Sequence, residues 1–144
     1  MHWLAGQLEI INQLKGQYQQ HTYVVAKEGA SVTPLLKESK DAFFLALHRL
    51  VEDISKRPGI IACFISNEGL LVESHGVQDD LEGLAAMSQL AINSAGKICD
   101  SLNLGPLQQT IVVGSMKKVA LFSLGEVEVG ILSLTNTNLS KTLS

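Results

Sequence analysis

The chain has 144 residues, of which 46% are hydrophobic and 17% are charged, and its formal net charge is −3 at pH 7. A chain of this length and apolar content can bury a core, which excludes a disordered segment. Eleven basic against fourteen acidic residues, without a basic stripe, argue against nucleic acid as a partner.

Nothing at the sequence level suggests export or a membrane. The apolar runs are far shorter than the roughly 20 residues of a membrane-spanning helix, and the first residues lack the regions of a secretory signal. We therefore expect a cytoplasmic protein without membrane insertion. Cys63 and Cys99 suit neither a disulfide framework nor a metal-ligand spacing, so two buried free thiols are expected.

The chain begins with a predicted amphipathic helix, whose apolar stripe at helical spacing is Leu4, Leu8, Ile11, Leu14 and Tyr18. This helix docks on its own chain, pairs with a second copy or binds a partner, and the sequence leaves these three options open. Residues 21–38 keep no period, so we predict a linker there with at most one short strand. The expected division is an extension over residues 1–38 and a domain over residues 39–144.

A second helix is predicted from Ser39 to Arg57, where the sequence Arg-Pro-Gly ends it. A β-hairpin follows over residues 60–76, with a three-residue turn at residues 67–69 in which Gly69 is left-handed. In that register Cys63 pairs with Glu73 and Ile61 pairs with His75. Cys63, Glu73 and His75 would then share one face of the strands.

The next predicted helix is long, running from about Asp80 to Leu102. Asp79 and Glu82 form a capping-box pattern at its start, and Gly105 with Pro106 ends it. One face carries mostly small residues, which let another backbone approach closely: Leu81, Ala85, Ser88, Ile92, Ala95, Cys99 and Leu102. This stripe packs either on the chain's own sheet or on a second copy, and the pattern alone favours neither.

Three β-rich runs, 108–114, 118–124 and 126–135, are joined by short turns and predict an antiparallel meander. In the tail, Asn136 or Thr137 would cap a last short helix that carries Leu139 and Leu143 on one face. Several strands are apolar on both faces, which predicts helices on both sides of the sheet. The fold class is therefore α/β of the α+β kind.

The sequence contains no nucleotide-hydrolysis loop and no other local catalytic motif, so the chain is predicted not to be an enzyme. The four histidines are scattered, and we expect no metal site and no cofactor. Cys63 lies mid-strand without a neighbouring oxyanion stabiliser, which makes a structural role the better interpretation. Glu73 and His75 lie toward an open strand end, and Lys117 and Lys118 lie at a turn, where solvent or a partner protein would satisfy them.

The segment from Ser39 onward resembles the roadblock/LC7 family. The features that carry the resemblance are the helix ending in RPGI, the hairpin ACFISNEGLLVES, the Ala-rich helix DDLEGLAAMSQLAINSAGKI, the three strands and the ending TNLS. Ser140 departs from the glycine common in that ending. The first 38 residues have no counterpart in the minimal family domain.

This resemblance implies a five-stranded antiparallel sheet with helices on both faces. Numbered along the chain, the strands would follow the order second, first, fifth, fourth, third. It also implies a homodimer through the central helix and the third strand, with the interface at Leu81, Ala85, Ser88, Ile92, Ala95, Cys99, Thr110, Ile111, Val112 and Val113. Family members commonly bind small Ras-like GTPases as activators or scaffolds.

We therefore expect a dimeric regulator or scaffold that binds a small Ras-like GTPase and has no active site of its own. The only arginines, Arg49 and Arg57, lie in or at the end of a helix and argue against an arginine finger. A GTPase-activating effect would then act by reshaping the switch loops. The alternative is a profilin-like or PAS-like module that senses a ligand beside Cys63 and His75, with no GTPase partner.

Overall fold

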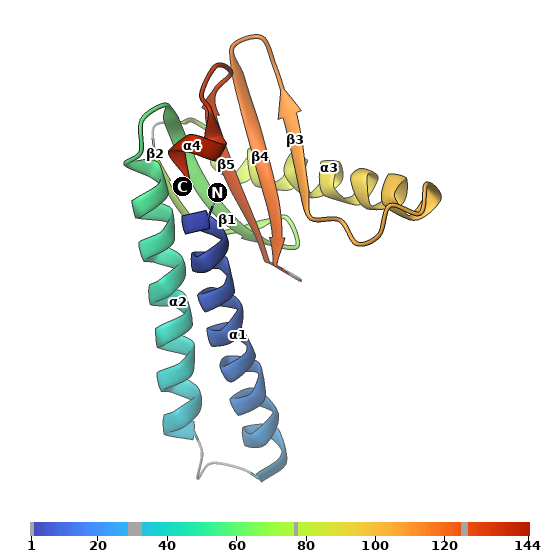
Figure 1. Ribbon diagram of the computed structural model, residues 1–144. Coiled ribbons are helices and arrows are strands. Elements are labelled where there is room, and N and C mark those ends of the chain that lie inside the picture. Colours follow the sequence, from blue (N-terminus) through green and yellow to red (C-terminus); the bar gives the residue numbers. More distant parts are fainter. Residues whose placement is uncertain (1, 29–32, 77, 125–126) are drawn as a thin grey trace.

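The computed structural model describes residues 2–28, 33–76, 78–124 and 127–144. Along the chain, its elements are α1 (His2–Glu28), α2 (Thr33–Ser55), β1 (Ile60–Asn67), β2 (Leu70–Gly76), α3 (Leu81–Ser101), β3 (Gln109–Val113), β4 (Lys117–Leu124), β5 (Val127–Leu134) and α4 (Leu139–Thr142) (Figure 1). Within the described ranges, no helix combines the length and the apolar character needed to cross a membrane.

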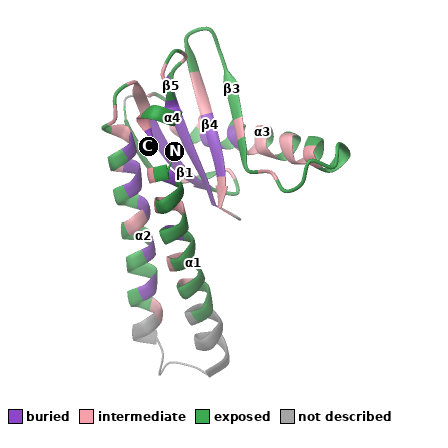
Figure 2. Ribbon diagram, in the orientation of Figure 1, coloured by how far each residue is buried: buried purple, intermediate pink, exposed green. Residues whose placement is uncertain are grey.

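The five strands form one antiparallel sheet in the order β2-β1-β5-β4-β3, which confirms the predicted fold. Strand β5 lies in the middle of the sheet and is buried along nearly its whole length (Figure 2). Strands β2 and β3 are the two edges. Each edge strand therefore offers one row of backbone groups that no other strand of the sheet pairs with.

Helices cover both faces of the sheet, as the doubly apolar strands predicted. One core joins α1, α2 and α4 to the face of the sheet that carries Cys63, Ile65 and Ile131. The other core is smaller and joins α3 to the opposite face through Phe64, Ala85 and Leu121. In Figure 1, α1 and α2 lie side by side and extend away from the sheet, while α3 lies behind it.

The N-terminal helix α1 docks on its own chain, which was one of the three predicted options. Leu4 and Ile11 are buried in the larger core. The guanidinium of Arg57, just after α2, lies 3.8 Å from the centroid of the Trp3 ring and donates a hydrogen bond of 2.6 Å to the carbonyl oxygen of Thr142. Arg57 therefore ties the start of α1 to the end of the chain.

The prediction of a linker over residues 21–38 is wrong where the structure describes that segment. Helix α1 continues to Glu28 and α2 begins at Thr33, while residues 29–32 lie outside the described residues. Helical stability in proteins comes mainly from packing, and α1 and α2 pack along each other. This contact stabilises the helical conformation where the local sequence shows no hydrophobic period. The predicted division after residue 38 falls inside α2.

The hairpin differs from its predicted register. Glu68 and Gly69 both have positive φ, 51° and 83°, so the turn has two residues and not three. Cys63 therefore pairs with His75 in place of Glu73. A bulge in β2 opposite Ser66 inserts one extra residue and restores the alternation. Cys63, Glu73 and His75 consequently share one face, as predicted.

Two helix caps also differ from the predictions. Asp80, not Asp79, caps α3, and its Oδ1 accepts a hydrogen bond of 3.0 Å from the backbone N–H of Gly83. Asn138, not Asn136 or Thr137, caps α4 by accepting from the backbone N–H of Lys141. Neighbouring Asp, Asn and Thr residues are all good caps, so only the backbone path decides which of them is used.

Candidate partner-binding surface

Exposed apolar side chains gather on α3 and on the adjacent edge strand β3. They are Met87, Leu90 and Ile98 on α3 and Leu102 directly after it, each more than half exposed. On β3 they are Ile111, Val112 and Val113, which are 45–61% exposed. Figure 1 shows α3 crossing behind the sheet and continuing past β3. An apolar edge strand with an unpaired backbone pairs readily with another chain.

The predicted small-residue stripe of α3 is divided between two environments. Ala85 and Ser88 are buried, and Leu81 and Ile92 pack against the smaller core, so the first half of the stripe contacts the chain's own sheet. Ala95 and Cys99 are half-buried. Among the predicted interface residues, Ile111, Val112 and Val113 of β3 are the exposed ones.

The exposed residues of α3 were missed by the sequence reasoning. Met87, Leu90 and Ile98 lie a quarter to almost half a turn around α3 from the predicted stripe, whereas Leu102 was already part of it. A helix that covers one sheet needs only one apolar stripe. The extra width of the apolar face was therefore the signal in the sequence that a second surface exists.

An apolar groove separates α3 from the strands β3 and β4. It encloses a cavity of about 250 Å³. The lining side chains come from α3 on one wall and from the two strands on the other: Leu84, Met87, Ser88, Ala91, Val112, Val119 and Leu121. Ser88 is the only polar residue among them, so the groove suits apolar side chains of a protein partner.

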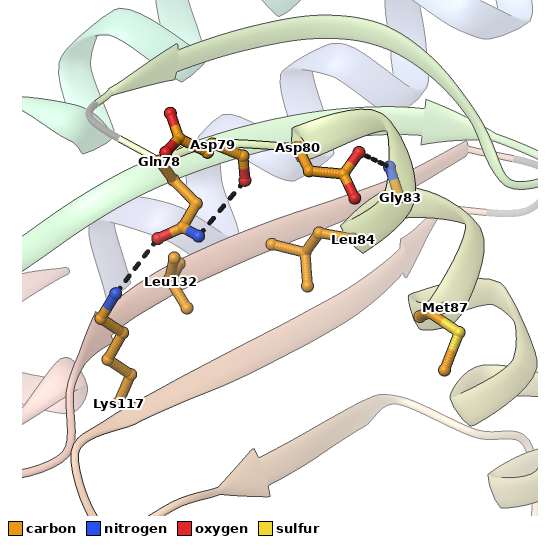
Figure 3. Close-up of a pocket in the computed structure, with 8 residues that line it drawn as sticks. All are labelled: Gln78, Asp79, Asp80, Gly83, Leu84, Met87, Lys117 and Leu132. Atoms are coloured by element: carbon orange, nitrogen blue, oxygen red, sulfur yellow. Dashed lines mark hydrogen bonds between the residues drawn. The ribbon is translucent and has the colours of Figure 1, made fainter.

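The groove continues toward the start of α3, since Leu84 and Met87 also line a second cavity of about 350 Å³ (Figure 3). On its rim the Lys117 Nζ donates a hydrogen bond of 3.2 Å to Gln78 Oε1. The carboxylate of Asp80 lies on the other side, where it caps α3. Apolar side chains therefore form the floor, and the cation of Lys117 and the acidic residues Asp79 and Asp80 lie at the rim.

The predicted contacts Lys117 and Lys118 lie on opposite faces of the sheet. Lys117 is at the rim of the groove on the α3 side, whereas the Lys118 Nζ donates to the carbonyl oxygen of Thr137 on the other face. Successive side chains of a strand alternate between faces. One partner protein that approaches the groove would therefore meet Lys117 alone, and both lysines stay predictions as partner contacts.

The predicted contacts Glu73 and His75 face α2. Glu73 Oε2 lies 3.2 Å from His48 Nδ1, and His75 Nδ1 lies 3.1 Å from Ser55 Oγ. These two residues therefore make a separate group on β2, at the edge of the sheet farthest from β3. Their role toward a partner stays a prediction.

Cys63 lies where no nucleophile could act. Its side chain is fully buried in the larger core, and this burial raises the pKa of the thiol well above its ordinary value. A catalytic cysteine needs an accessible site that lowers its pKa. Across the described ranges, no group of three His, Cys, Asp or Glu side chains could hold a metal ion.

Glu128 on β5 is a buried carboxyl whose removal should stabilise the protein at neutral pH. Its exposure is 5%, and its Oε2 accepts a long hydrogen bond of 3.5 Å from Ser66 Oγ. Burial raises the pKa of Glu128. The folded state therefore holds this proton more tightly than the unfolded state, and stability is lost as the pH rises through the folded pKa.

We expect Glu128→Gln to raise the free energy of unfolding at pH 7, with a gain that disappears near pH 4. Urea unfolding curves at both pH values would measure it. The control is Glu9→Gln on the exposed side of α1, for which no such difference is expected. A variant that is less stable than the wild type at pH 7 would show that the carboxylate is stabilising.

Residues 47–132 match the family model described as Roadblock/LC7 domain. No curated protein matches the chain. The Roadblock/LC7 domain from Streptomyces avermitilis has a TM-score of 0.60 at 14% identity, covering 67% of this chain and 84% of that one. MglB of Myxococcus xanthus has a TM-score of 0.60 at 14% identity, covering 67% and 81%. The gliding protein MglB from Thermus thermophilus has a TM-score of 0.59 at 13% identity, covering 65% and 75%. At these identities the likeness concerns the fold.

Proposed function

Because this chain belongs to the Roadblock/LC7 domain family, we propose that it is a dimeric regulator or scaffold that binds a small Ras-like GTPase. It would work in the cytoplasm without catalysis of its own. The observation that supports this proposal is the exposed apolar surface on α3 and β3. Residues 39–144 would form the family domain, and residues 1–38 would form its N-terminal extension.

In the proposed dimer, β3 pairs with β3 of a second copy, and the two sheets become one. A two-fold axis at this edge brings the same surface of both copies together. The apolar groove beside Val112 and Met87 would then receive side chains from the partner's α3. The exposed residues Met87, Leu90, Ile98 and Leu102 would join the predicted interface residues of the central helix and of β3.

The positions of the two arginines support an effect through the switch loops, if GTP hydrolysis is stimulated. The guanidinium of Arg57 is held by Trp3 and by Thr142. Arg49 lies on α2, which covers the sheet face opposite α3. Neither is placed to reach a nucleotide from the candidate surface, as an arginine finger must.

The test is to mix the purified protein with small Ras-like GTPases of the same organism, bound to GDP or to a GTP analogue. Size-exclusion chromatography with light scattering should show a complex that contains two copies of this chain. Arg49→Ala should leave both binding and any stimulated hydrolysis unchanged. The absence of a complex in both nucleotide states would contradict the proposal.

The ligand-sensing alternative receives less support. It was predicted to use a cavity beside Cys63 and His75, but Cys63 is packed inside the larger core and His75 contacts Ser55 of α2. A buried, close-packed position leaves no room for a ligand.

A further inference from the structure

The edge strand β2 contacts α2 through polar side chains. On that face Glu73 reaches His48, and His75 reaches Ser55. Its apolar anchor, Leu71, packs on the opposite face, against the core under α3. The attachment of β2 to α2 therefore depends on hydrogen bonds and charge more than on apolar contact.

His48 lies between two carboxylates. Its Nδ1 is 3.2 Å from Oε2 of Glu73 on β2, and its Nε2 is 3.3 Å from Oε1 of Glu52 on α2. A neutral imidazole carries one N–H and would turn a lone pair toward one of the carboxylates, whereas imidazolium donates from both nitrogens. The geometry is therefore that of a protonated histidine.

We propose that His48 is a pH-sensitive clasp that fastens the edge strand β2 to α2 in the protonated state and releases it as the pH rises. The charged groups that face it are Glu73 from β2 and Glu52 from α2. Strand β1 contributes the buried, uncharged Cys63 and Ile65 to this side. His75, a second histidine between β2 and α2, contacts Ser55.

The direction of the effect follows from the same contacts. The hydrogen bond to Glu73 and the charge of Glu52 raise the pKa of His48 above its ordinary value. A raised folded pKa gives stabilisation that is complete below the unfolded pKa and is lost as the pH rises through the folded value. Because the His48 side chain is half exposed, the effect should change local opening of β2 more than global unfolding.

Amide hydrogen exchange at pH 5.5 and pH 8.5, corrected for intrinsic exchange rates, tests the clasp. We expect the protection factors of β2 to be about threefold lower at pH 8.5, the size expected for one exposed ion pair. Those of the central strand β5 should change by a smaller factor. In His48→Gln the β2 protection should be low at both pH values, and the control His2→Gln on α1 should behave like the wild type.

A second measurement follows the His48 ring protons by NMR during a pH titration. Glu73→Gln should lower the pKa of His48 toward its ordinary value and abolish the pH response of β2. A pH-independent β2 in the wild type, or an unchanged response in His48→Gln, would overturn the proposal. So would a His48 pKa that is the same with and without the Glu73 carboxylate.

Discussion

Val112→Lys is expected to convert the protein from a dimer into a monomer. Val112 is 51% exposed on β3 and lines the apolar groove next to α3, so a lysine there can reach solvent in the single chain. In the proposed dimer the same ammonium would be buried without a partner. A penalty of about 3 kcal/mol for such a charge corresponds to a dissociation constant about 100-fold higher.

Sedimentation equilibrium over a range of concentrations would measure this change. The matched control is Leu45→Lys, which places the same charge at a residue that is 48% exposed on α2. It should leave the dimer intact. Circular dichroism should show both variants folded, and a dimeric Val112→Lys would mean that the groove is not the interface. A monomeric wild type would contradict the dimer itself.

Gly130→Ala is expected to lower the free energy of unfolding by about 3 kcal/mol, the upper part of the usual range for overpacking. An added Cβ at Gly130 would lie 2.1 Å from Cζ and 2.3 Å from Cε1 of the Phe64 ring. Phe64 is fully buried between the sheet and α3, where it packs with Ala85 and Leu121. The ring cannot move aside without displacing the helix.

Thermal and urea unfolding would measure the loss, which corresponds to a fall in Tm of about 10 °C for a chain of this size. Gly16→Ala on α1 is the matched control, because nothing lies within 4 Å of its added Cβ. It should be slightly stabilising, by about 0.5–1 kcal/mol. Phe64→Leu combined with Gly130→Ala should cost less than the sum of the two single changes. Strictly additive effects would show that the two sites do not clash.

The patterns that were predictable are those in which residue type and spacing alone decide. Runs such as Ile60–Ile65 and Val119–Phe122 are apolar at consecutive positions, and this identifies strands that are covered on both faces. The five strands, their antiparallel pairing and the helices on both sides followed from such runs and from the family resemblance. The candidate interface strand was identified in the same way, and its role stays a prediction.

The register of the hairpin shows where local reasoning ends. The predicted hairpin has a three-residue turn, whereas the observed one has a two-residue turn followed by a bulge. Both arrangements place Cys63, Glu73 and His75 on the same face. The alternation of side chains is satisfied by both, so it cannot separate them. The choice depends on how Leu71 packs under α3, which is a contact between segments distant in sequence.

By itself, the sequence determined the class of fold, the identity of the strands and the absence of a local catalytic motif, since each depends on short-range periodicity and residue chemistry. Only the tertiary structure decided three further features. Helix α1 extends to Glu28 because α2 packs along it. The first half of the α3 stripe faces the chain's own sheet, which leaves Met87 and Leu90 on the outside. Glu73 contacts His48 because the sheet places β2 beside α2. Each of these outcomes depends on which long-range surfaces bury the most apolar area together, and no window of local sequence contains that information.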